Sequence, residues 1–153
     1  MQKLSIEERV QKLEDKEAIL NITFEYAFNI NLGADRRQVN TKALRKIFSK
    51  DAIWECQAMN ILVKGIDNII SRIISETKSV LFSMHSYSNP IITISGCNAR
   101  AHFLFWITSK MEKKYLNQVF MSQHLHYLKT KNGWRISKVQ LYFGEHIKTV
   151  SAQ

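Results

Sequence analysis

The first part of the chain carries apolar residues at helical spacing. Ser5 and Glu8 fit a capping box, which predicts that a helix begins near Ile6. The apolar positions that follow recur every three or four residues: Ile6, Val10, Leu13, Leu20, Phe24 and Phe28, widened by Ile19, Ile22, Tyr26 and Ile30. So broad an apolar surface predicts a helix that lies against a sheet, with Gly33 as its C-cap.

Two shorter segments also follow the helical period. Thr41 can cap a short helix that buries Leu44, Ile47 and Phe48. The apolar residues at helical spacing further along are Ile66, Ile69, Ile70, Ile73 and Ile74. This spacing predicts a helix that ends near Lys78, although the β-branching of isoleucine favours a strand.

The remaining apolar runs predict strands. Residues 53–56 and 61–63 form two short strands. A hairpin follows, in which a run ending at Ile94 and a very apolar strand from Ala99 to Thr108 flank a turn at 95–98. Bulky residues on both faces of the second of these strands predict a central strand that is covered on both sides.

The end of the chain predicts a second hairpin. Positions 119–127 alternate between two faces, which is typical of a long strand. Asn132-Gly133 matches a type I′ turn, and residues 134–143 form the final strand, followed by a tail from His146 that is predicted to be loose. Helices interleaved with short strands, and then a run of long antiparallel strands, indicate an α+β fold.

Composition and charge narrow the class of protein. The 153 residues suit a single domain, residues 1–153, with a composition ordinary for globular proteins. The N-terminal residues do not form a signal peptide, and Cys56 and Cys97 lack disulfide or zinc spacing, so we expect a reduced, cytoplasmic setting. No apolar run is long enough to predict a membrane partner. The net charge of +9 raises the alternative of nucleic-acid binding, but scattered basic residues make that alternative the less favoured one.

Short motifs over most of the chain occur in the order seen in one known family. Residues 13–19 read LEDKEAI, Tyr26-Ala27 follows, residues 44–52 read LRKIFSKDA, Gly65-Ile66 opens a helix, residues 85–90 read HSYSNP, and residues 133–136 read GWRI. Each motif alone is weak. Together, and in this order, they resemble the SnoaL-like polyketide cyclase and scytalone dehydratase group, which shares the nuclear transport factor 2-like fold.

The resemblance implies a fold and a kind of chemistry. In this group a curved antiparallel sheet wraps around three helices to form a cone, whose apolar interior binds a small molecule, and members are commonly dimers. Its enzymes often pair an Asp at the end of the first helix with a His on a strand, so that the carboxylate supports the imidazole while it moves a proton. The matching positions here are Asn31 and His85. An amide cannot offset an imidazolium charge, and Asp35 is the alternative carboxylate.

Several residues are therefore candidates for a site. His85 is the leading acid–base group, and Asn31 and Tyr26 would orient it or stabilise an enolate oxygen. Each also has a structural interpretation: a satisfied core histidine, a helix-terminal Asn and a core Tyr. The candidate pocket residues are Trp54, His102, Phe103, Phe105 and Trp106. His124 and His126 share one strand face, but a third ligand is not evident, so no metal site is predicted.

Two hypotheses about function follow. The first is an apolar cone cavity for a small cyclic or polyketide-like molecule, in a homodimer formed through the outer sheet face. Any reaction would then be a dehydration, isomerisation or cyclisation that needs no cofactor and no metal. The second is a non-catalytic ligand-binding or protein-interaction module that kept the cone and lost the carboxylate.

Overall fold

Three helices occupy the first half of the chain and four long strands the second, in a computed structural model that describes residues 4–33, 38–112 and 115–150. The helices are α1 (Ile6–Ile30), α2 (Thr41–Ile47) and α3 (Ile66–Thr77), with a short 3-10 helix, η1 (Gln57–Met59). The strands are β1 (Phe48–Cys56), β2 (Ile61–Lys64), β3 (Phe82–Ser95), β4 (Asn98–Glu112), β5 (Tyr115–Thr130) and β6 (Gly133–Val150). The predicted α+β order is confirmed.

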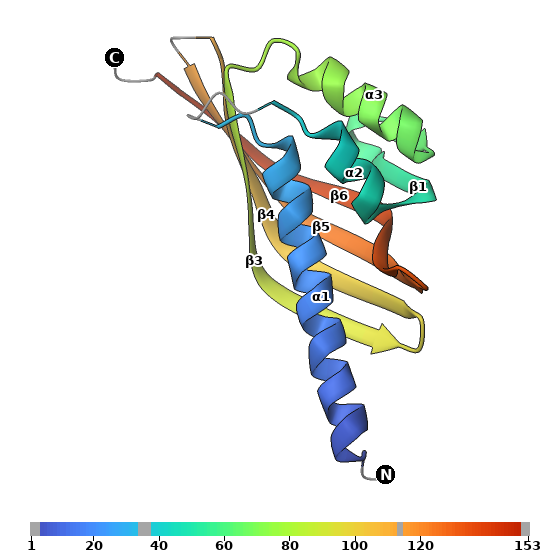
Figure 1. Cartoon of the computed structure of the whole chain (residues 1–153). Helices are drawn as coiled ribbons and strands as arrows, with labels where there is room; N and C mark the ends of the chain where they lie inside the picture. Colours follow the sequence, from blue (N-terminus) through green and yellow to red (C-terminus); the bar gives the residue numbers. More distant parts are fainter. Residues whose placement is uncertain (1–3, 34–37, 113–114, 151–153) are drawn as a thin grey trace.

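The six strands form one curved, open sheet that wraps around the helices, as Figure 1 shows. Their order is β2-β1-β6-β5-β4-β3, and the neighbouring pairs are antiparallel except for β1 and β6. The sheet is therefore mixed, and the prediction of a wholly antiparallel sheet is wrong for this one pair. β1 and β6 lie far apart in the sequence, so no hairpin constrains their relative direction.

The long helix α1 begins and ends with defined caps. The Ser5 hydroxyl accepts from the Glu8 backbone N–H, and the Glu8 carboxylate accepts from the Ser5 N–H, which confirms the predicted capping box. The C-cap is Asn31, so the predicted C-cap at Gly33 is wrong. Asn31 turns to an extended backbone conformation, so the helix ends two residues early and the chain runs on toward β3.

Only one side of α1 is covered by the rest of the fold. Ile19, Ile22, Tyr26 and Ile30 are buried against the sheet. The other predicted stripe is exposed at Ile6, Val10, Leu13, Phe24 and Phe28, and its remaining member, Leu20, is partly buried against the core. The prediction that both stripes pack on the sheet is wrong, because the N-terminal half of the helix projects beyond the sheet (Figure 1) and the two stripes face different directions.

The other helices begin close to their predicted positions. The cap of α2 is Asn40, whose Oδ1 accepts from the Ala43 N–H at 3.0 Å, so the predicted cap at Thr41 is wrong by one residue. The isoleucine pattern after Gly65 is confirmed as helical. Ile74 is the exception to its buried face, since it is 47% exposed.

Both predicted hairpins form, with a correction to the second turn and to the tail. Thr130 pairs with Gly133, so the connecting residues are Lys131 and Asn132. Gly133 has a φ of +91° and Asn132 does not have a positive φ, which rules out the predicted type I′ turn. The residues from His146 to Val150 extend β6 and pair with β5, because β5 begins early enough to offer them a partner.

The strand β4 has one covered face. Phe103 and Phe105 are buried beneath the helices, whereas Leu104, between them, is 54% exposed on the outer face of the sheet. β4 lies inside the sheet, between β5 and the edge strand β3, but the prediction that both of its faces are covered is wrong. Within the described residues, none of the helices is long and apolar enough to cross a membrane.

Asp15 anchors the middle of α1 to the β5–β6 hairpin. One carboxylate oxygen accepts from Lys129 Nζ at 2.7 Å and from Trp134 Nε1 at 2.9 Å. Burial opposes ionisation of Asp15, but the hydrogen bonds from Lys129 and Trp134 prevail and lower its pKa. Because the Trp134 side chain is buried, it depends on this acceptor.

We expect Asp15→Ala to lower the free energy of unfolding by about 1–3 kcal/mol, because it leaves the buried Trp134 N–H without a partner. Urea denaturation monitored by circular dichroism measures the change. Arg45→Ala is the matched control, since it removes an exposed ion pair with Asp67 and should change stability by less than about 1 kcal/mol. Equal losses in the two variants would contradict the anchoring role of Asp15.

Candidate functional site

A short bridge brings the end of α1 to the strand that carries His85. The Leu32 N–H donates to the Ser83 carbonyl at 3.2 Å, and the Ser83 N–H donates back to the Leu32 carbonyl at 2.8 Å. The Ser83 hydroxyl also accepts from the Leu32 N–H. Leu32 follows Asn31 directly, and Ser83 lies two residues before His85. The bridge between them therefore brings the side chains of Asn31 and His85 together.

One oxygen atom of Asn31 contacts two atoms of His85. Oδ1 accepts from the His85 backbone N–H at 2.8 Å and lies 2.8 Å from Nδ1 of the ring. The backbone N–H can only donate, so the oxygen of the amide must face it. Nδ1 meets the same oxygen and must therefore carry the hydrogen, which leaves Nε2 as the acceptor nitrogen.

The surroundings of His85 keep the imidazole neutral. Its ring stacks on Phe105, with 5.9 Å between centroids and 27° between planes. Burial lowers the pKa of His85 from 6.5 to about 4. A carboxylate at position 31 would counter this effect, but the amide of Asn31 carries no charge, so His85 is a neutral acceptor at physiological pH.

His85 lines a cavity of about 80 Å³ between the helices and the concave face of the sheet. The predicted site residues Tyr26, Trp54 and Phe105 line it as well. Asn31 is not in the lining and contacts the cavity through His85. The other described lining residues are Ile30, Ile73, Glu76, Thr77, Ile107, Gln123 and Leu141.

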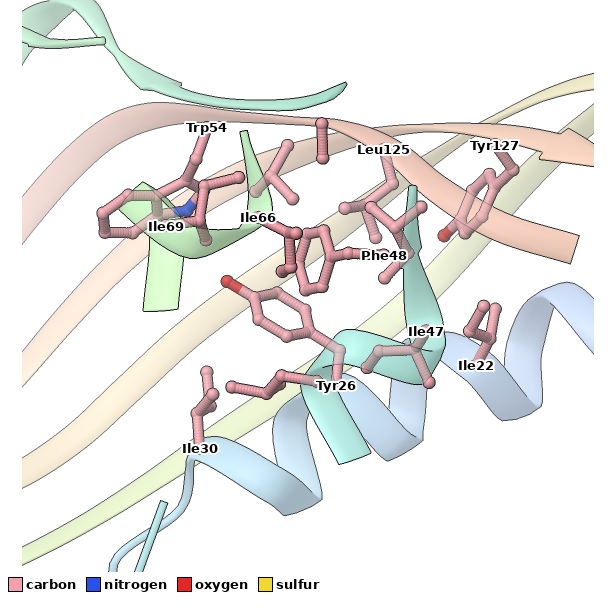
Figure 2. Close-up of a cluster of buried hydrophobic side chains, with 14 of the residues drawn as sticks. Ile22, Tyr26, Ile30, Ile47, Phe48, Trp54, Ile66, Ile69, Leu125 and Tyr127 are labelled. Atoms are coloured by element: carbon pink, nitrogen blue, oxygen red, sulfur yellow. The ribbon is translucent and has the colours of Figure 1, made fainter. Parts of the chain in front are cut away.

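Tyr26 and Trp54 bring two donors to this cavity. Figure 2 shows the Tyr26 side chain on α1 pointing toward Trp54 on β1. Burial, and then the charge of Glu76, raise the pKa of Tyr26, and the nearby Trp54 indole lowers it in part, so the phenol stays protonated. The indole N–H acts on the phenol in this way, but Trp54 Nε1 does not reach hydrogen-bond geometry with it. Among the described side chains, Trp54 Nε1 is the one buried nitrogen or oxygen without a hydrogen-bond partner.

Three predicted pocket residues lie elsewhere. Alternation along β4 places His102 and Trp106 on the outer face, where the His102 ring stacks on His124 with 3.9 Å between centroids. Phe103 faces inward but packs in the core against Tyr87, outside this cavity. Neighbouring residues of a strand face opposite ways, which places His102 and Trp106 outside the cavity. Phe103 shares the inward face with Phe105, and its side chain is part of the packed core.

Three polar residues of the cavity, Gln123, Glu76 and Thr77, were not predicted. Gln123 is almost fully buried and accepts a hydrogen bond from the Tyr87 hydroxyl. Its signal was a polar residue in phase with Met121 and Leu125 on the inward face of β5. Glu76 lies on α3 three residues after Ile73, at the end of the buried stripe, which was the available signal for it.

A larger groove adjoins the cavity. It has a volume of about 660 Å³ and lies between the end of α1, the start of α2 and the connection from α3 to β3. Thr77 lines both the groove and the His85 cavity. Asp35, the alternative carboxylate, lies outside the described residues. The described part of the chain contains no group of three or more His, Cys, Asp or Glu that could hold a metal ion.

A family model for the SnoaL-like domain matches residues 11–140. The chain belongs to the SnoaL-like family. The predicted family is thereby confirmed, and the match includes both Asn31 and His85. No curated protein matches the sequence of this SnoaL-like chain.

Solved structures agree with the family at the level of the fold. A hexachlorocyclohexane dehydrochlorinase, LinA-type3 from Novosphingobium barchaimii, is similar with a TM-score of 0.78 and 14% identity, over 92% of this chain and 94% of that one. A protein assigned as a scytalone dehydratase from Novosphingobium aromaticivorans has a TM-score of 0.77 and 15% identity, over 89% of this chain and 88% of that one. A nuclear transport factor 2-like protein from Salmonella enterica has a TM-score of 0.73 and 14% identity, over 88% of this chain and 94% of that one. The predicted α+β cone of the nuclear transport factor 2-like type is confirmed.

We expect His85 of this SnoaL-like protein to titrate at a pH of about 4, as the Nδ1–H tautomer. The folded pKa lies below the unfolded value, so the stability contributed by neutral His85 is complete above pH 6.5 and falls as the pH decreases toward 4. A titration followed by imidazole ¹⁵N NMR measures both the pKa and the tautomer. Asn31→Asp should raise the pKa of His85 by about one to three units. A wild-type midpoint near 6.5 would show that the ring is not enclosed.

Proposed function

We propose that this SnoaL-like protein binds a small, mainly apolar molecule in the His85 cavity and moves a proton within it as a cofactor-independent lyase, isomerase or cyclase. The observation that carries the proposal is the pair of contacts from Asn31 Oδ1 to His85. They fix the ring with Nδ1 protonated, so that Nε2 is the nitrogen available to a bound molecule. A fixed, desolvated acceptor in an apolar cavity is suited to take a proton from carbon or oxygen.

The proton step needs only groups of this chain. A C–H or O–H bond of the substrate breaks, its proton goes to His85 Nε2, and its electron pair forms a double bond or a negative oxygen. The resulting imidazolium still donates from Nδ1 to the Asn31 oxygen. Because that oxygen is neutral, His85 is a weaker base than one beside a carboxylate, and the substrate proton must be correspondingly more acidic.

The names of two of the similar structures support this reaction class. One is named a dehydrochlorinase and the other is assigned as a dehydratase. They share the fold of this chain at 14% and 15% identity. We infer from them the class of reaction and not the substrate.

The size of the cavity limits the bound molecule. A volume of about 80 Å³ lies well below the roughly 300–1,000 Å³ of sites for drug-sized ligands. A polyketide-sized molecule would not fit this cavity alone. The groove that shares Thr77 gives room for a larger substrate, with its reacting end at His85 and the remainder between α2 and α3.

A second candidate function is ligand binding without chemistry, and Asn31 favours it. A neutral amide with an imidazole of low pKa makes a stable hydrogen-bonding site but a weak base. The same cavity would then recognise its ligand without converting it. We retain the homodimer through the outer sheet face as part of either proposal.

A deuterium-exchange assay separates the two functions. Small cyclic ketones, phenols and hydroxy acids are first screened by thermal shift, and each ligand found is incubated with the protein in D₂O. We expect proton NMR to show exchange of its acidic hydrogens by wild type, with His85→Ala slower by about 10²–10⁴-fold. The wild-type rate should be level between pH 5 and 8, since His85 is deprotonated throughout that range.

Asn31→Asp is the informative companion variant. A carboxylate in the place of the amide makes His85 a stronger base, so we expect exchange to be faster by roughly tenfold or more. A ligand that binds wild type and Asn31→Asp without exchange in either would overturn the enzymatic proposal and leave the binding function. His85→Gln, which can still donate to Asn31, controls for loss of the local structure.

A further inference from the structure

A cluster of three polar groups lies at one place in the His85 cavity. Tyr26, on α1, points toward Trp54 on β1 (Figure 2), and the charge of the Glu76 carboxylate, on α3, acts on its hydroxyl. The three groups come from three separate elements and all line the cavity. Their arrangement bears on the kind of molecule that the cavity binds, which the position of His85 alone does not determine.

The indole N–H of Trp54 is a buried hydrogen-bond donor without an acceptor. The side chain is 7% exposed, and its N–H lacks a partner among the described residues. Leaving a buried donor unpaired costs about 1–3 kcal/mol, and native proteins rarely retain such a group without a reason. The contrast with Gln123 is informative, because the carbonyl oxygen of that buried amide accepts from the Tyr87 hydroxyl within the protein.

Glu76 determines which acceptor can approach. It carries the one carboxylate among the described lining residues. Arg72 Nε lies 2.6 Å from one of its oxygens and offsets part of the charge, but this pair is exposed and screened by solvent. The remaining negative charge is felt at Tyr26, so a carboxylate ligand would be repelled at the place where an acceptor is needed.

We propose that the cavity binds a small neutral carbonyl compound, whose oxygen accepts hydrogen bonds from Trp54 Nε1 and the Tyr26 hydroxyl. The proposal rests on the proposed function in taking the His85 cavity as the ligand site, and it specifies the substrate class. A carbonyl oxygen accepts two hydrogen bonds without bringing a charge near Glu76. The net charge of +9 would by itself favour anions, so selection for a neutral ligand is a local property of this cavity.

Binding of three matched probes tests the proposal. Cyclopentanone has the neutral acceptor, methylenecyclopentane has the same shape without it, and cyclopentanecarboxylate has a charged one. We expect wild type to bind cyclopentanone at least about fivefold more tightly than the other two probes. In a ¹⁵N–¹H spectrum, cyclopentanone should move the Trp54 indole N–H signal downfield, and it should leave the signal of Trp106, on the outer face, in place.

Variants assign the effect to the named groups. Trp54→Phe should weaken cyclopentanone binding by roughly fivefold to tenfold, whereas Trp106→Phe, the matched control, should leave it unchanged. Glu76→Gln should strengthen cyclopentanecarboxylate binding by at least about fivefold, with little effect on the ketone. Because Glu76 is partly exposed, this variant should fold normally.

The outcomes separate this proposal from the enzymatic one. Equal binding of the three probes, equal binding by wild type and Trp54→Phe, or an unmoved Trp54 signal at saturating ketone would overturn it. So would a folded wild type that binds no cyclopentanone up to the solubility limit. Ketone binding with a shifted Trp54 signal but without deuterium exchange would support the ligand class and remove the enzymatic function.

Discussion

The site depends on one oxygen atom, Oδ1 of Asn31, which accepts from the backbone and from the ring of the same residue, His85. The double contact fixes the position of β3 against the end of α1 and fixes the tautomer of the ring at once. It works because α1 ends at Ile30 and the next residues pair with Ser83 on β3. If the helix continued to Gly33, Asn31 would lie inside a helix and the bridge could not form.

The cavity lies between the curved sheet and the helices, where polar side chains interrupt the apolar core. The core of isoleucine, leucine and aromatic side chains fills most of the space between the sheet and the helices. Near the end of α3 the lining contains polar groups from α1, β1, α3, β3 and β5. The Tyr87 hydroxyl donates to the Gln123 carbonyl oxygen there, and Thr23 and Tyr127 share a hydrogen bond elsewhere in the core, so the unpaired N–H of Trp54 is an exception among the described side chains.

The periodicity of apolar residues predicted the helices and strands well. It predicted less well which residues are buried and how the strands pair. The capping box, the isoleucine helix and both hairpins depend on local chemistry, and all are present. Burial depends on what lies opposite, so Ile6 and Leu13 followed the helical period and are nevertheless exposed. The direction of β6 relative to β1 depends on the whole chain between them, and no local signal could supply it.

In the site, too, the sequence predicted some residues, and others could be placed only by the tertiary structure. The series of motifs gave His85 and Asn31, and the structure brings these two side chains together. Trp54 and Phe105 were predicted by their apolar character and line the cavity, while His102 and Trp106, chosen by the same character, face outward. A continuous run of bulky residues conceals the phase of the strand. Glu76 was missed because an acidic residue on a helix is usually solvated, and its place beside the cavity is a tertiary fact.

An amide at position 31 changes the balance between stability and reactivity in this site. A carboxylate paired with an imidazolium would need to be desolvated at the same place, and burying two charges costs several kcal/mol per ion before their attraction is counted. The neutral pair of Asn31 and His85 keeps the same hydrogen-bond geometry without that cost. In exchange, the ring loses proton affinity, as its low pKa shows. Reactive substrates or simple recognition suit such a site, and a strongly basic mechanism does not.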